Sequence, residues 1–121
     1  MKKKAWKARI KKACIEVGTY RESFDSVITS LAETLETRDK VRKYYEESGA
    51  LPIVQHTNKS GNTNIVKNPI LTMYDDLNNT ALMYWRELGL TPKGLKAIDE
   101  TAMKRGKPKN SLGAALRDLG I

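Results

Sequence analysis

The segment between Asn68 and Gly89 constrains the fold more than any other part of this sequence. Asn68 can cap a helix and Pro69 fits its first position, so the pair marks a strong helix start, and Gly89 is a typical C-terminal stop. At helical spacing, the apolar side chains of residues 69–88 span an arc of roughly 180°, whereas a one-sided surface helix needs only about 100°. We therefore expect this helix to pack in two directions, onto its own domain and onto another subunit. The candidates for the contact between subunits are Leu71, Tyr74, Leu82 and Trp85.

Helices are also expected before this segment. Residues 2–17 carry one apolar stripe and end before Gly18, which predicts a first helix. Thr19 with Glu22 fits a capping box and predicts that a second helix begins at Thr19 and ends near residue 48. The stripe of this second helix continues into arginines at positions 38 and 42. Either the helix breaks near Thr37, or its end faces a different surface.

Residues 51–67 change in character. Two short β-branched runs flank Asn58–Asn62, and Gly61 can supply a positive φ, so we expect a hairpin or an extended loop. Because a lone hairpin is marginal in water, it should lean on helices or on a neighbouring chain.

Further helices are expected after Gly89. Thr91-Pro92 repeats the cap-plus-proline signal and predicts a fourth helix that ends near Arg105. After a linker, a short apolar helix is predicted, which would dock on its own assembly or meet a partner through Leu112, Leu116 and Leu119.

The net charge of +8 is unevenly distributed. Residues 1–12 carry seven basic side chains and no acid, residues 13–92 are mildly acidic, and the remainder is basic again. This asymmetry indicates a polyanionic partner met by the ends of the chain. The main DNA-binding candidates are Lys2, Lys3, Lys4, Lys7, Arg9, Lys11 and Lys12. The secondary candidates are Lys104, Arg105, Lys107 and Lys109.

The sequence lacks the residue motifs that most catalytic and cofactor-binding sites require. His56 is the only histidine, and no nucleophile motif accompanies it. The chain has no Walker-type phosphate loop and no compact group of metal ligands, so we expect no ATP hydrolysis, cofactor or metal. Cys14 is the only cysteine, which excludes an intrachain disulfide. No apolar run approaches the roughly 20 residues of a membrane helix, and Lys7 and Arg9 interrupt any secretory signal, so a cytoplasmic protein is expected.

Three stretches, in one order, carry a resemblance to a known family. They are Gly18-Thr19-Tyr20 with the apolar residues after it, Asn68-Pro69 with its helix through Tyr84 and Glu87, and the turn Leu88-Gly89-Leu90-Thr91-Pro92. The chain resembles phage terminase small subunits over about residues 15–98. The family usually continues the turn with a small polar residue and an arginine, where this chain has Lys93-Gly94-Leu95.

The resemblance implies a mainly α, non-enzymatic protein that assembles into a ring in the host bacterial cytoplasm. It implies double-stranded viral DNA and the terminase large subunit, which holds the ATPase and nuclease, as partners. The expected organisation is a basic N-terminal helix (1–17), a helical core and oligomerisation domain with a hairpin near 51–67 (18–105), and a C-terminal linker with a short helix (106–121). The alternatives are a small helical DNA-binding regulator outside packaging, a small nuclease built around His56, and a purely structural interaction protein.

Overall fold

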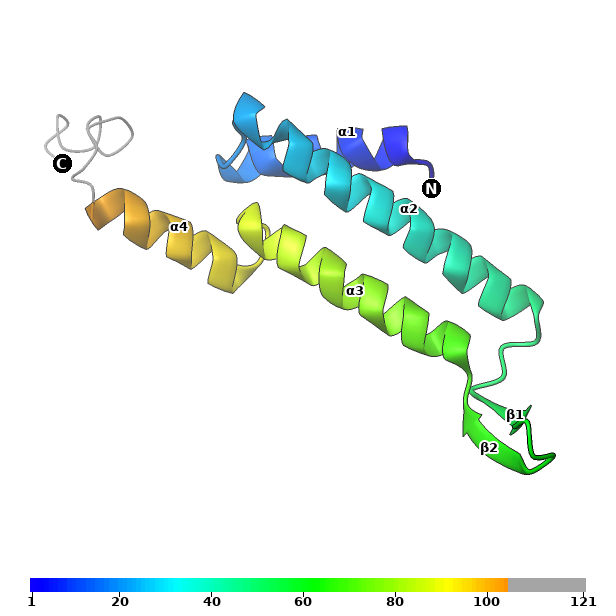
Figure 1. The fold of residues 1–121 in the computed structure, drawn as a ribbon. Helices are drawn as coiled ribbons and strands as arrows, with labels where there is room; N and C mark the ends of the chain where they lie inside the picture. Colours follow the sequence, from blue (N-terminus) through cyan, green and yellow to red (C-terminus); the bar gives the residue numbers. More distant parts are fainter. Residues whose placement is uncertain (105–121) are drawn as a thin grey trace, which may run out of the picture.

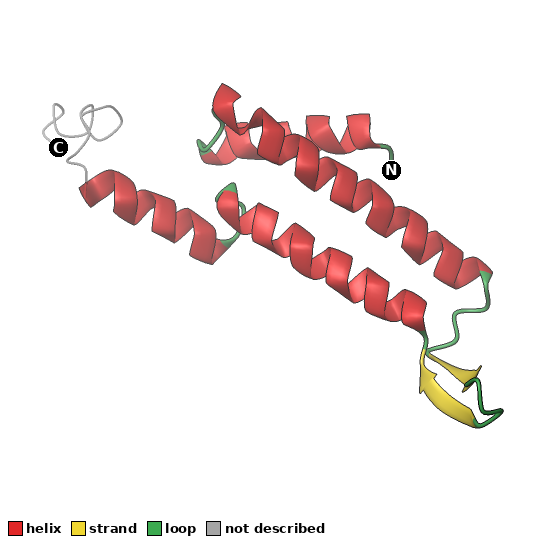
Figure 2. Cartoon of the chain, in the orientation of Figure 1, coloured by secondary structure: helices red, strands yellow, loops and turns green. Residues whose placement is uncertain are grey.

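A computed structural model of the chain describes residues 1–104, and the side chains of residues 1–98. The structure is mainly helical with one two-stranded antiparallel sheet, as the sequence predicts (Figure 1, Figure 2). In chain order its elements are α1 (Lys3–Val17), the 3-10 turn η1 (Glu22–Phe24), α2 (Asp25–Glu47), β1 (Ile53–Thr57), β2 (Thr63–Lys67), α3 (Pro69–Glu87) and α4 (Pro92–Lys104). Within residues 1–104, none of these helices is both long enough and apolar enough to cross a lipid bilayer.

Helix α2 lies at the centre of the packing, because both α1 and α3 pack against it. Leu31 and Leu35 of α2 are fully buried, together with Ile10 of α1 and Leu88 at the end of α3. These side chains belong to one hydrophobic cluster that draws on all three helices. Each buried leucine or isoleucine stabilises the fold by about 1.5–3 kcal/mol relative to leaving it exposed. The first helix is therefore part of the core and not a free basic tail.

The helix caps around α3 and α4 confirm the predictions from the sequence. Asn68 accepts a hydrogen bond from the Ile70 amide at 3.0 Å, which satisfies an amide that the first turn of α3 leaves unpaired. Thr91 does the same for α4, where its hydroxyl accepts from the Gly94 amide at 3.0 Å. Gly89 between the two helices has a φ of +71°, a conformation that favours glycine.

The predicted capping box at the start of the second helix is wrong. Residues 22–24 form a 3-10 turn, and α2 begins only at Asp25. The Thr19 hydroxyl instead donates a hydrogen bond of 2.8 Å to the carbonyl oxygen of Leu88, at the far end of α3. Thr19 is buried, and its hydroxyl forms this tertiary hydrogen bond instead of capping the helix that follows it.

Helix α2 continues without a break through Thr37, which decides between the two alternatives left open by the sequence. The arginines that interrupt its apolar stripe lie against aromatic rings. The guanidinium of Arg38 lies 5.7 Å from the centre of the Trp6 ring. That of Arg42 lies 5.6 Å from the ring of Tyr45 and 5.5 Å from the ring of Tyr74 on α3. Cation–π attraction therefore places these charges at helix contacts where an apolar residue would be expected.

The hairpin is confirmed and its register is regular, with Val54 opposite Val66 and Thr57 opposite Thr63. It extends from the end of the helical body that lies away from α4 (Figure 1). Val54 and Val66 are half-buried, whereas Ile53 and Ile65 are exposed by 56% and 70%. The hairpin therefore presents these two isoleucine side chains to solvent in the single chain.

The buried hydroxyl of Thr19 provides a test of this packing. Replacing Thr19 with valine keeps the shape and leaves the Leu88 carbonyl without its donor. We expect the free energy of unfolding to fall by about 1–3 kcal/mol. Urea denaturation at one fixed protein concentration measures the change, and Thr72→Val, at an exposed position of α3, is the matched control. Equal stabilities of the two variants would contradict the role given to Thr19.

Candidate nucleic-acid interface

Helix α1 carries most of the predicted DNA-binding residues, and its buried side fixes which of them face outward. Ile10 and Cys14 are fully buried against α2, with Trp6 packed beside them. Burial raises the pKa of the Cys14 thiol, and a hydrogen bond with Thr19 only partly opposes this. The Cys14 thiol therefore belongs to the hydrophobic core.

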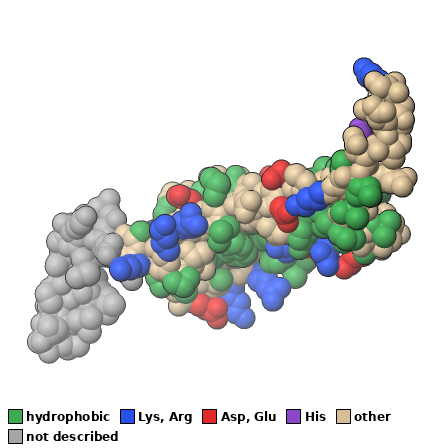
Figure 3. Space-filling model, turned by 90° about the horizontal axis from the view of Figure 1, so that it is seen from below, with side chains coloured by type: hydrophobic (Ala, Val, Ile, Leu, Met, Phe, Trp, Pro, Cys, Tyr) green, Lys and Arg blue, Asp and Glu red, His purple; other side chains and the backbone are tan. Residues whose placement is uncertain are grey.

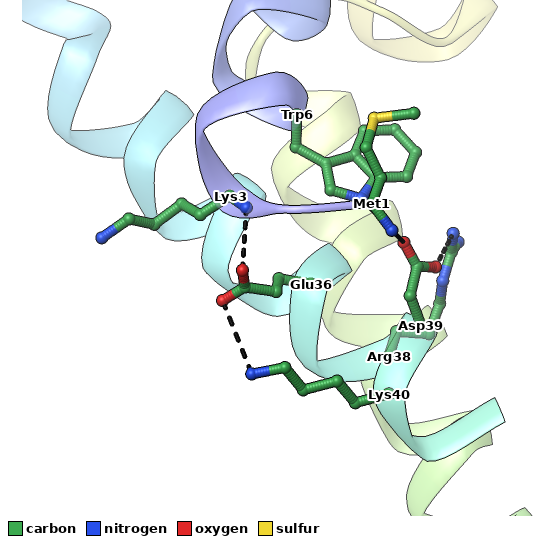
Figure 4. Close-up of polar contacts among 7 residues, drawn as sticks. All are labelled: Met1, Lys3, Trp6, Glu36, Arg38, Asp39 and Lys40. Carbon is green, nitrogen blue, oxygen red and sulfur yellow. Dashed lines mark hydrogen bonds and ion pairs between the residues drawn. The ribbon is translucent and has the colours of Figure 1, made fainter. Parts of the chain in front are cut away.

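A carboxylate on α2 holds the beginning of α1 (Figure 4). Asp39 accepts a hydrogen bond of 2.8 Å from the Trp6 indole and forms ion pairs with the Met1 ammonium at 3.1 Å and with Arg38 at 3.0 Å. Burial raises the pKa of Asp39, but the hydrogen bonds from Trp6, Met1 and Arg38 outweigh it and hold the pKa below its ordinary value. The negative charge of Asp39 therefore stabilises the docked position of α1.

Acidic residues of α2 also take up part of the positive charge of α1. The Lys3 amide donates to Glu36 at 2.9 Å, and the Lys3 ammonium lies 3.3 Å from Glu33. The hydrogen bond from Lys3 is the main reason that the pKa of Glu36 is lowered, and Lys40 adds to it against the opposing effect of burial. Lys3 is half-buried and faces α2, so it contributes less to the outer surface than its neighbours.

The remaining basic residues of α1 are exposed, but they do not all point the same way. Lys4, Lys7 and Lys11 follow helical spacing along one side, which we call the outer basic row. The Lys11 ammonium lies 5.0 Å from the centre of the Tyr20 ring, so the row ends beside the connection to α2. Arg9 lies on another side, with its guanidinium 5.7 Å from the centre of the Trp6 ring. Lys2 and Lys12 complete the exposed set.

The other predicted contact residues differ in whether the structure describes them and in how exposed they are. The Lys104 side chain, Arg105, Lys107 and Lys109 lie outside the described side chains, as do Leu112, Leu116 and Leu119. On α3, Trp85 packs against the core of its own chain, and Tyr74 lies beside Arg42. Leu71 is half-buried and Leu82 is 44% exposed. Leu82, Met73 at 53% exposure and Met83 at 63% exposure are thus large apolar side chains of α3 that remain open to another molecule.

A basic cleft was missed by the sequence analysis. Arg21, Arg86 and Lys93 line one cavity between the α1–α2 connection and the junction of α3 with α4. These residues come from three places in the chain and share no periodicity. Their position beside the Gly18 and Gly89 turns was the only signal available in the sequence.

His56 lies exposed on β1, opposite Asn64 of β2. Among residues with described placement, no group of three or more histidine, cysteine or acidic side chains is arranged to hold a metal ion. Beside the acids that hold α1, the structure brings together basic and aromatic residues in this region, a combination suited to polyanion binding.

A family model described as the small subunit of phage terminase matches residues 3–104, which is nearly the whole described part of the chain. No curated protein and no solved structure matches the chain.

Asp39 gives a prediction about pH. Because its pKa is lowered in the folded protein, its contribution to stability is complete above the ordinary carboxyl pKa of about 4 and is lost as the pH falls through the folded-state pKa. We expect Asp39→Asn to lower the melting temperature at pH 7, and the difference from the wild type to shrink below about pH 4. Asp76→Asn, at an exposed site on α3, is the control. A difference that stays constant from neutral to acidic pH would count against an ionised Asp39 as the group that holds α1.

Proposed function

Because the chain belongs to the phage terminase small subunit family, we propose that it binds viral DNA and presents it to the terminase large subunit for packaging into procapsids. The large subunit would supply the ATPase and nuclease, and this chain would act without catalysis in the host cytoplasm. The family establishes a role in genome packaging. The DNA contact and the transfer to the large subunit are the parts that we propose.

The outer basic row of α1 is the observation that supports DNA binding most directly. Lys4, Lys7 and Lys11 are exposed on a helix that Ile10 and Cys14 hold in the core. Lysines act as point charges on phosphates, so they position DNA without reading its sequence. Because α2 holds the helix, the three ammonium groups belong to a fixed surface and not to a tail.

Assembly into a ring would make this contact strong. Several copies of a weak phosphate contact on one DNA molecule act together, so their combined affinity far exceeds that of one subunit. Leu82 and Met83 are exposed on α3, and Ile53 and Ile65 are exposed on the hairpin, another part of the chain. Two different apolar surfaces on one subunit suit a head-to-tail contact, which closes into a ring when the rotation permits.

The DNA contact can be tested through its salt dependence. Replacing Lys4 and Lys7 with glutamine should make the log–log slope of affinity against salt less steep by about two units for each subunit that contacts the DNA, one for each lost phosphate contact. Fluorescence anisotropy with duplex DNA over a salt series measures the slope. The control, Lys59→Gln with Lys67→Gln, removes the same charge from the hairpin end of the chain. Equal slopes for the two variants would move the DNA site away from α1.

The assembly can be tested at Leu82. We expect Leu82→Glu to shift the protein towards monomer, because it places a charge in an apolar contact without touching the core. Light scattering after size exclusion measures the mass, and Asn79→Glu, at an exposed position of the same helix, is the control. A wild-type monomer at tens of micromolar with intact helicity would refute the ring. A dimer on a short palindromic DNA site would favour a regulator.

A further inference from the structure

The basic cleft has a volume of about 550 Å³. One wall is the connection from α1 to α2, with Gly18, Arg21 and Phe24, and the other is formed by the last turn of α3 and the first turns of α4. Arg86 and Lys93 belong to this second wall. The cleft therefore lies where chain segments distant in the sequence meet.

Close backbone packing fixes the shape of the cleft. The hydrogen bond from Thr19 to the Leu88 carbonyl joins its two walls. Gly94 lies against the last turn of α3, where a Cβ atom would collide with the carbonyl oxygen of Arg86. The absence of a side chain at Gly94 thus lets α4 begin directly against α3 and brings Lys93 into the same cavity as Arg86.

No described side chain forms an ion pair with the cations of the cleft. Among the side chains that the structure describes, no acid lies within ion-pair distance of Arg21, Arg86 or Lys93. Arg21 donates one hydrogen bond to the Tyr20 carbonyl at 2.8 Å, which leaves its other donors available. Among the lining residues that the structure describes, Glu87 is the single acid. Lys and Arg side chains also gather near the start of α4 in the space-filling view (Figure 3).

We infer that this cleft binds a phosphate group of the DNA backbone. Like charges held close together repel one another, and an anion placed between them removes that cost. Guanidinium groups match the geometry of phosphate oxygens, and the ammonium of Lys93 adds a point charge. The inference rests on the proposed DNA-binding function and gives it a second contact, separate from α1.

The position of the cleft is compatible with one DNA molecule touching both sites. Lys11, at the end of the outer basic row, lies against the ring of Tyr20, and Arg21 is the next residue in the chain. The row and the cleft are thus joined by adjacent residues. A DNA backbone that follows α1 towards its C-terminal end therefore arrives at the cleft.

The test removes charge from the cleft and measures duplex DNA binding over a salt series. Arg86→Gln with Lys93→Gln should make the log–log slope less steep by about one unit for each subunit that contacts the DNA, because each cleft would lose one phosphate. The control is again Lys59→Gln with Lys67→Gln, at the opposite end of the molecule (Figure 1). Circular dichroism and light scattering establish that all variants keep the helicity and the mass of the wild type.

A second measurement uses the unaltered protein, in case the cleft variant does not fold. We expect duplex DNA to slow acetylation of Lys93 several-fold while the rate at Lys59 stays constant, as followed by mass spectrometry of peptides. Parallel samples contain inorganic phosphate or ATP in place of DNA. Equal protection of Lys93 by either compound would identify the cleft as a site for a free phosphate compound and overturn DNA as its ligand.

The outcomes separate this inference from the proposed function. If the wild-type protein does not bind duplex DNA at low salt, the proposed function fails and the cleft loses its ligand. A second outcome is that the wild type binds DNA and the α1 variant binds more weakly, while the cleft variant keeps the wild-type slope and Lys93 is not protected. In that case the proposed function stands and only the cleft is refuted as a DNA contact. A less steep slope together with protection of Lys93 by DNA supports both.

Discussion

The packing of α2 against both α1 and α3 is the contact on which the other parts of the structure depend. A short chain buries a modest share of its surface, and here one helix supplies the core for two neighbours. Leu31 and Leu35 are fully buried in this contact. The same packing orients α1, because Ile10 and Cys14 must face α2 and the lysines must then face elsewhere. The basic surface is therefore a consequence of how the core is shared.

The parts of the fold that the sequence predicted are those set by local chemistry. Asn68 caps α3 and Gly61 adopts a positive φ in the hairpin turn, as the residue types require. The errors arose where distant residues meet. Thr19 was assigned a local cap because its partner Leu88 is far away in the sequence. At Arg42 the sequence left two alternatives open, because the rings of Tyr45 and Tyr74 come together beside it only after folding.

The candidate site also has one part that the sequence predicted and another that only the folded chain reveals. A run of lysines near the start of the chain is visible in the sequence and indicates a polyanionic partner. Which of them are available is a tertiary property, since Glu33 and Glu36 engage Lys3 but leave Lys4 and Lys7 exposed. The cleft could not be predicted, because its cations come from three segments that only the Thr19 contact and the close approach of Gly94 bring together.

The hairpin has a consequence for how a single subunit behaves on its own. It is a sheet of only two strands, so β1 and β2 each keep one edge without a strand partner in the described chain. Such a unit is marginally stable in water, so we expect it to open without the rest of the protein unfolding. Its amide hydrogens then exchange with solvent through local opening, far faster than those of α2. A neighbour that covered Ile53 and Ile65 would slow this exchange, so the hairpin is the natural reporter of whether a subunit is alone or assembled.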